Sequence, residues 1–137
     1  MTFITSKSGS SSSSGRTGRL IGGYRNLIVW KEAKNLTVLV YKLTERFPKN
    51  EEFGLKIQMR KAAVSVMSQI AEGWLRKSKR GKLYYLEIAL GSLLELENQG
   101  EVAKAVGFWN ENDYLKFDKQ RAKVAYLLYR YVKKIEQ

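Results

Sequence analysis

The amino-acid sequence predicts an all-α protein, an antiparallel up-down-up-down four-helix bundle preceded by a disordered N-terminal tail. Apolar residues recur every three or four positions over four long segments of the chain. Each segment ends at a helix-stopping residue or at a short polar connection, and none has the alternating pattern of a strand. Helices joined by connections of a few residues pack most simply as antiparallel neighbours.

The first 23 residues lack the helical pattern. Serine and glycine dominate this segment, which carries too little apolar surface to fold. We therefore expect a flexible tail over residues 1–23 and one folded domain over residues 24–137. The charged residues of the tail are Lys7, Arg16 and Arg19, so the tail is either a basic arm or, more simply, a linker.

The first two predicted helices lie between Gly23 and residue 75. The first ends before Pro48, which stops its apolar stripe of Val29, Ala33, Leu36, Val40, Leu43 and Phe47. Asn50 is the predicted cap of the second helix. This helix carries a stripe of Leu55, Met59, Ala62, Val66, Ile70 and Trp74, and it runs to a basic connector over residues 76–81.

The third predicted helix extends to Val106, where Gly107 ends it in a left-handed conformation. Its stripe consists of Leu83, Leu86, Leu90, Leu93 and Leu96. We expect Gly91 to lie where this helix closely approaches another helix. The fourth helix begins at a cap formed by Asn110, with Asp113 three residues later. Its stripe consists of Phe117, Val124, Leu128, Tyr131 and Ile135.

The first and fourth helices carry more apolar residues than one packing seam requires. We expect this additional apolar surface to form the interface of a homo-oligomer, with Trp30, Tyr41, Tyr126 and Tyr129 among its residues. The alternative is a wide apolar stripe within a monomeric bundle.

The composition excludes many kinds of chemistry. The chain has no cysteine and no histidine, so disulfides, thiol nucleophiles, Cys/His zinc sites and imidazole acid–base catalysis are excluded. We expect neither catalytic residues nor a metal or other cofactor. The sequence also shows neither the apolar segment of an export signal nor a long apolar run, so we expect a cytoplasmic protein that does not bind a membrane.

The charge of the chain is strongly positive and unevenly distributed. Twenty-five Lys and Arg stand against thirteen Asp and Glu, a net charge of +12. If neighbouring helices are antiparallel, one end of the bundle collects most of the excess positive charge and attracts polyanions. The expected nucleic-acid-binding residues are Arg25, Arg76, Lys77, Lys79, Arg80, Lys82, Lys123, Arg130, Lys133 and Lys134. Tyrosines at positions 84, 85, 126 and 129 lie beside them, where bases can stack.

Several spaced motifs resemble one protein family. These are residues 24–31 (YRNLIVWK), 47–48 (FP), 53–55 (FGL), 58–65 (QMRKAAVS), 70–73 (IAEG) and 89–95 (ALGSLLE). They resemble the four-helix-bundle proteins encoded in intervening sequences of bacterial 23S ribosomal RNA. The resemblance implies an up-down bundle, assembly into a homopentamer, RNA or other nucleic-acid binding, and no established enzymatic activity.

Two other functions remain open. The architecture is also similar to that of the accessory subunit of diversity-generating retroelements, which implies a reverse transcriptase and its template RNA as partners. The second alternative is a structural oligomer that binds no ligand.

Overall fold

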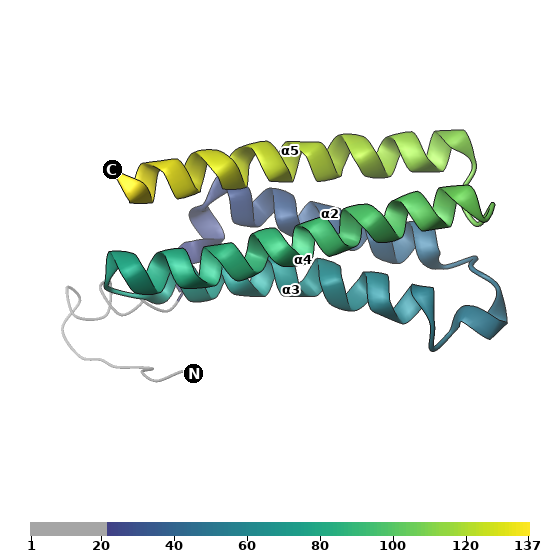
Figure 1. The fold of residues 1–137 in the computed structure, drawn as a ribbon, viewed down its shortest axis with the longest axis horizontal. Helices are drawn as coiled ribbons and strands as arrows, with labels where there is room; N and C mark the ends of the chain where they lie inside the picture. Colours follow the sequence, from purple (N-terminus) through teal and green to yellow (C-terminus); the bar gives the residue numbers. More distant parts are fainter. Residues whose placement is uncertain (1–21) are drawn as a thin grey trace.

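The computed structural model describes residues 22–137, which form a bundle of four α-helices (Figure 1). Almost all of the predicted tail lies outside the described residues. The elements, in chain order, are η1 (Gly23–Asn26), α2 (Ile28–Thr44), η2 (Lys49–Glu51), α3 (Leu55–Leu75), α4 (Lys79–Ala105) and α5 (Glu111–Glu136). The all-α class predicted from the sequence is confirmed, and the described part of the chain contains no strand.

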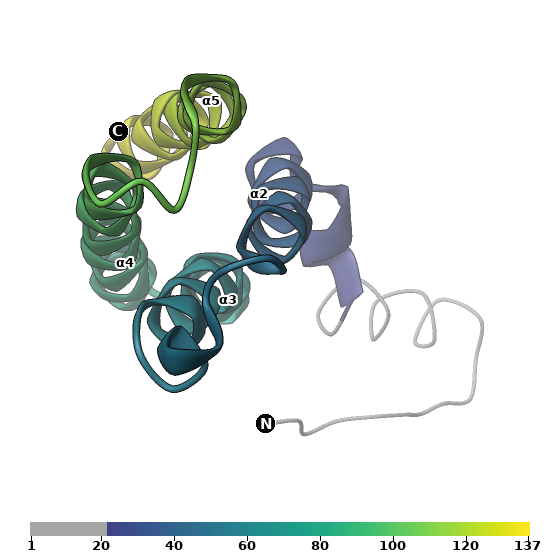
Figure 2. The same ribbon diagram turned by 90° about the vertical axis from the view of Figure 1, so that its right-hand side faces the viewer.

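Successive helices run in opposite directions. Each helix contacts two others, in the order α2, α3, α4, α5 around the bundle, and α5 closes the ring against α2 (Figure 2). Hydrogen bonds between helices fix these directions. Between α2 and α3, Thr37 Oγ1 donates to the carbonyl of Ala63, whereas Arg60 Nε donates to Thr44 Oγ1. The partner number therefore falls as the α2 number rises, as it must between antiparallel helices.

The core is built from the predicted apolar stripes. The residues of these stripes that are buried are Val29, Ala33, Leu36, Val40, Phe47, Met59, Ala62, Val66, Ile70, Leu86, Leu93, Leu96, Phe117, Val124 and Leu128. Two side chains of the core come from loops instead, and one of them is Phe47, which follows the end of α2. Trp109 precedes α5, is buried against Phe117 and Phe47, and donates from Nε1 to the carbonyl of Leu43 over 2.7 Å. It closes one end of the bundle.

Two predicted helix ends are confirmed. Asn110 Oδ1 accepts a hydrogen bond from the backbone amide of Asp113 over 2.7 Å, which satisfies an amide at the start of α5. At the end of α4, Gly107 has a φ of 85°. This left-handed conformation favours glycine.

Two other predicted ends are wrong. Asn50 belongs to η2, and α3 begins only at Leu55, whose amide donates to the Glu51 carboxylate over 2.8 Å. The basic connector is also shorter than predicted, because α4 already begins at Lys79. Ser78 caps this helix, since its Oγ accepts from the amide of Gly81 over 3.0 Å. A serine at this position stabilises the start of a helix, because its hydroxyl accepts a hydrogen bond from one of the first free amides.

The prediction for Gly91 is also wrong within the single chain. A Cβ atom built on Gly91 meets nothing within 4 Å. The close approach occurs nine residues later, where Gly100 is buried and a Cβ would meet three ring atoms of Phe117 at 3.0 Å or less. Gly100 therefore allows α4 to pack against α5, whereas Gly91 lies on the solvent side of α4.

Candidate nucleic-acid interface

Several chain segments meet at one end of the bundle, where the antiparallel arrangement gathers positive charge (Figure 1). They are η1 with the start of α2, the connection between α3 and α4, and the last turns of α5. We call the nine basic residues of these segments the basic pole: Arg25, Arg76, Lys77, Lys79, Arg80, Lys82, Arg130, Lys133 and Lys134. Two grooves confirm that these segments lie together. One groove is lined by residues of both α4 and α5, and the other by residues of both α2 and α5.

The connection between α3 and α4 contributes charges of two kinds. The guanidinium of Arg76 pairs with Glu72 and lies 4.8 Å from the ring centroid of Tyr85, so its charge is partly compensated. Lys77, Lys79 and Arg80 are exposed and form no ion pair within residues 22–137. These three side chains are therefore free to contact an anion.

The position of Lys79 and Arg80 is electrostatically unfavourable within the chain itself. Both lie in the first turn of α4, which contains no acidic residue. The amide dipoles of a helix place partial positive charge at this end, where carboxylates stabilise the helix and cations destabilise it. The cations and the helix end together raise the local positive potential, which a phosphate group would relieve.

Lys82 has a different environment from the rest of the basic pole. It is half-buried, and its Nζ donates to the carbonyl of Trp74 over 2.9 Å. Burial lowers the pKa of this amine. The contact satisfies a carbonyl in the last turn of α3 and fixes the short connection to α4. We therefore assign Lys82 the role of positioning the exposed cations beside it.

The last turns of α5 combine cations with tyrosines. Arg130 donates to Tyr126 Oη over 3.0 Å, and the amine of Lys133 lies 5.4 Å from the ring centroid of Tyr129. Lys133 also lies 3.8 Å from Glu136. Lys134 is exposed and, within the described residues, unpaired. Exposed rings beside cations present flat surfaces on which nucleic-acid bases stack.

Two of the predicted binding residues lie toward the edge of this site. Arg25, in η1, is exposed and stacks over Tyr24, with its Cζ 5.1 Å from the ring centroid. Lys123 lies earlier in α5, about two turns before the basic pole begins, and pairs with Glu32 of α2 over 3.3 Å. Its charge is thereby partly compensated.

The four predicted interface residues divide into two groups. Tyr126 and Tyr129 are exposed on α5, by 58% and 57%. Tyr41 is 43% exposed on α2, and its ring lies under the guanidinium of Arg60. Trp30 is half-buried against the chain's own core and contacts Tyr24 edge-on. The two α5 tyrosines therefore offer the most free surface.

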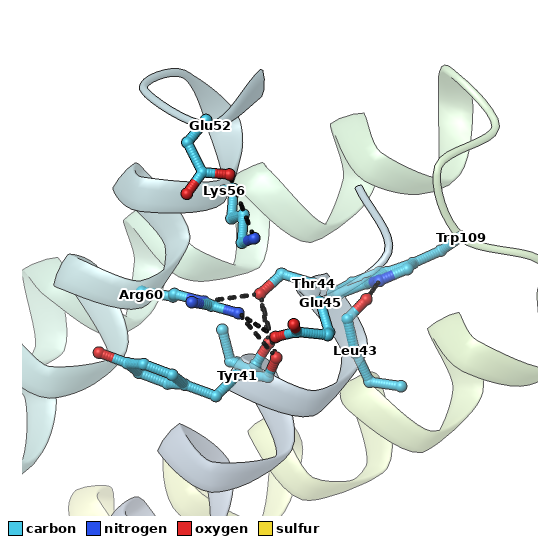
Figure 3. A network of polar contacts seen from close by, with 9 residues as sticks. Tyr41, Leu43, Thr44, Glu45, Glu52, Lys56, Arg60 and Trp109 are labelled. Carbon is cyan, nitrogen blue, oxygen red and sulfur yellow. Dashed lines mark hydrogen bonds and ion pairs between the residues drawn. The ribbon is translucent and has the colours of Figure 1, made fainter. Parts of the chain in front are cut away.

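At the opposite end of the bundle, three basic residues have acidic partners. Arg60 binds Thr44 Oγ1, the carbonyl of Tyr41 and the Glu45 carboxylate, and Lys56 pairs with Glu52 (Figure 3). Lys104 pairs with Glu111 in the same manner. The hydroxyl of Tyr114 donates to Glu101, and this hydrogen bond raises the pKa of Tyr114 to about 12. Lys42, Arg46 and Lys49 at this end also form no ion pair within residues 22–137, but Glu45, Glu51 and Glu52 lie close to them in the chain, so the excess of positive charge lies at the basic pole.

The described residues show neither a metal site nor a membrane helix. Over residues 22–137, the acidic side chains form no cluster of three that could ligate a metal ion. None of the four helices combines the length and the apolar character needed to cross a bilayer.

The comparison with protein families gives a clear match. The family model for the 23S rRNA-intervening sequence protein matches residues 25–130, which include most of the folded domain. The chain belongs to this family. The 23S rRNA-intervening sequence protein match confirms the resemblance found in the motifs, and it extends over much of α5, which none of the quoted motifs covers. A search of curated proteins found no match.

Proposed function

We propose that this protein is a homo-oligomeric RNA-binding protein without enzymatic activity, and that the basic pole holds the phosphates of the RNA. The observation that carries this proposal is the contrast in charge between the two ends of the bundle. Among residues 22–137, the nine residues of the basic pole stand against only Glu72, Glu87 and Glu136, whereas Arg60, Lys56 and Lys104 at the opposite end have acidic partners. Lys77, Lys79 and Arg80 at the other end have none within the described residues.

The binding energy would come mainly from electrostatics. Lys and Arg that neutralise phosphates release counterions condensed on the nucleic acid, so affinity falls steeply with salt. Phosphate contacts carry no sequence information, because they do not involve the bases. We therefore expect binding with little sequence preference. RNA is favoured over DNA because the family description names an intervening sequence of 23S rRNA.

Oligomerisation would strengthen this binding. Several copies that present their basic poles on one side multiply the contacts available to one RNA, and linked contacts raise the overall affinity. The sequence resemblance favours five copies, and the exposed tyrosines of α5 offer surface for such an assembly.

The test compares two triple variants with the parent protein. The first is Lys77→Glu, Lys79→Glu, Arg80→Glu at the basic pole. The matched control is Lys42→Glu, Arg46→Glu, Lys49→Glu at the opposite end, where all three side chains are also exposed and, among residues 22–137, without ion pairs. Both variants change the net charge equally. Binding to a fluorescein-labelled single-stranded RNA is followed by anisotropy over a range of salt concentrations.

We expect the first variant to lose most of its binding. The slope of log affinity against log salt should also flatten, by about 0.7 for every single-strand phosphate that the variant no longer neutralises. The control should retain binding within about threefold, because distant charges are screened beyond about 10 Å at 0.1 M salt. Equal losses in both variants would show that net charge matters and position does not. Unchanged binding in the first variant would exclude the basic pole as the binding site.

A further inference from the structure

The outer face of α4 is apolar and has no partner within the described chain. Tyr84, Ile88, Leu94 and Val102 are all exposed there, Tyr84 by 59% and Leu94 by 57%. At about 100° per residue, Tyr84, Ile88 and Val102 lie within about 40° of one another around the helix axis, and Leu94 lies at the margin of the same face. Gly91 lies on the same side, with free space where a Cβ would be. A helix face of this kind, with a small residue at its centre, permits close approach by a second helix.

Beyond the first turn of α4, which carries Arg80, the charges on this face are negative, although the chain as a whole carries +12. Between Lys82 and Lys104 the sequence contains no Lys or Arg. Glu87, Glu95 and Glu101 are exposed in this span. Phosphates would be repelled by these carboxylates, so the face suits a basic protein surface rather than RNA.

The outer face of α5 has the complementary character. Between Asp118 and Glu136 the sequence contains no acidic residue. The exposed residues of this face are Leu115, Lys116, Lys119, Lys123, Tyr126, Tyr129 and Arg130. It therefore combines apolar and aromatic surface with positive charge, in a helix nearly as long as α4.

We propose that the outer face of α4 packs antiparallel against the outer face of α5 in a second copy of this chain. The proposal rests on the proposed homo-oligomer and names the two surfaces that form it. One register places Glu87 opposite Arg130, Gly91 opposite Tyr126, and Val102 opposite Leu115. In this register Glu87 meets the opposite charge of Arg130, the small Gly91 faces the large ring of Tyr126, and the apolar side chains of Val102 and Leu115 pack together at the other end of the contact.

The pair Glu87 and Arg130 gives the register its strongest support. Both side chains are exposed, and neither forms an ion pair within residues 22–137. Arg130 has only the hydroxyl of Tyr126 as a side-chain partner there. An Arg placed beside a carboxylate forms a stronger, bidentate hydrogen bond. The contact would thus give both charged groups the partner that the single chain does not supply.

The geometry of this contact determines how the copies assemble. It joins two different surfaces, so every copy in the assembly keeps one α4 face and one α5 face available for its neighbours, and a suitable rotation closes a ring. Because α4 and α5 are antiparallel within one chain, the same relation between copies keeps all bundle axes pointing in one direction. All basic poles then lie on one rim of the ring.

The test is a charge exchange across the contact. Glu87→Arg places two guanidinium groups opposite each other, and Arg130→Glu places two carboxylates opposite each other. Each single variant should weaken assembly by about tenfold or more in dissociation constant, since like charges across an interface are costly. The double variant restores opposite charges and should recover most of the assembly. Light scattering and analytical ultracentrifugation over a dilution series measure the mass.

A second variant tests packing rather than charge. Gly91→Leu introduces a side chain whose Cβ meets nothing within 4 Å in the single chain but which faces Tyr126 of the next copy. It should dissociate the oligomer while far-UV circular dichroism shows an intact helical bundle. Glu52→Arg, on the turn before α3, is the control for a reversed exposed charge and should leave the mass unchanged.

The outcomes separate this inference from the proposed function. A parent protein that stays at 15.8 kDa at high micromolar concentration would overturn the contact, whatever its RNA affinity. An oligomer that is insensitive to Glu87→Arg and Gly91→Leu would place its interface elsewhere and would also overturn it. Failure of RNA binding with assembly intact would instead contradict the proposed function alone.

Discussion

Replacing Gly100 by alanine tests the packing of α4 against α5 with a single carbon atom. Gly100 is buried, and the added Cβ would meet three ring atoms of Phe117 at 3.0 Å or less. The ring has little freedom to move, because Phe117 is fully buried and packs against the ring of Trp109 at a centroid distance of 4.9 Å. Trp109 is itself fixed by its hydrogen bond to Leu43.

Two opposing contributions determine the result. Overpacking of a filled core costs about 1 to 3 kcal/mol. Alanine has a higher helix propensity than glycine, which stabilises the folded state by about 0.5 to 1 kcal/mol. We therefore expect Gly100→Ala to lower the free energy of unfolding by about 1 kcal/mol. A change of this size lowers the melting temperature of a domain of this length by about 4 °C.

The assay is denaturant unfolding followed by far-UV circular dichroism at several protein concentrations. Gly91→Ala is the matched control on the same helix, because its Cβ meets nothing within 4 Å. In a single chain only the propensity contribution remains there, so at protein concentrations low enough for the monomer Gly91→Ala should raise the free energy of unfolding by about 0.5 to 1 kcal/mol. Opposite signs for the two variants support the packing described for Gly100. A Gly100→Ala protein at least as stable as the parent would refute it.

Two further predictions concern electrostatics. Lys79→Glu and Arg80→Glu should each raise the free energy of unfolding by about 0.3 to 1 kcal/mol while weakening RNA binding. The reason is that a carboxylate stabilises the first turn of α4, whereas a cation destabilises it. A lower melting temperature in both variants than in the parent would contradict this. Tyr114 ionises near pH 10 in an unfolded chain but at about 12 in the fold, so its contribution to stability is complete below pH 10 and is lost as the pH rises toward 12. Tyr114→Phe should therefore show a smaller loss of stability than the parent between pH 10 and 12, and parallel stability curves would count against the Glu101 hydrogen bond.

The fold was predictable because its main determinants are local. The buried stripes follow directly from helical spacing, and Asn110 and Gly107 act through their own backbone neighbours. Trp109 could not be placed in this way. It lies outside every stripe, and its burial depends on Phe47 and Leu43, more than 60 residues earlier in the chain.

Two glycines of α4 show what helical spacing can decide. Gly91 and Gly100 both interrupt a long helix, so the residue type alone does not tell them apart. They differ only in what lies opposite each, which is solvent in one case and Phe117 in the other. Helical spacing does separate them, since Gly100 falls on the side of Leu93 and Leu96, whereas Gly91 falls on the side of Tyr84 and Ile88.

The candidate site was predictable as a region but not in its details. Antiparallel helices of known order determine which segments share an end, and this alone collects the basic pole. The roles of single residues depend on contacts that spacing does not specify. Lys82 is directed to a carbonyl of α3, and Lys123 pairs with Glu32 of α2. Conversely, the acidic character of α4 can be read from the sequence, which has no Lys or Arg from residue 83 to residue 103. The apolar stripes alone do not reveal this feature.

The short connection between α3 and α4 has a consequence for the change in heat capacity on binding. Only three residues separate these helices, Ser78 caps the second, and Lys82 ties it to the end of the first. The backbone that carries Lys77, Lys79 and Arg80 is therefore already ordered before any ligand arrives, and little conformational entropy is lost on binding. Segments that fold as they bind show a large negative change in heat capacity, because they bury apolar surface in the process. An RNA held by this rigid turn should associate with a heat capacity change near zero.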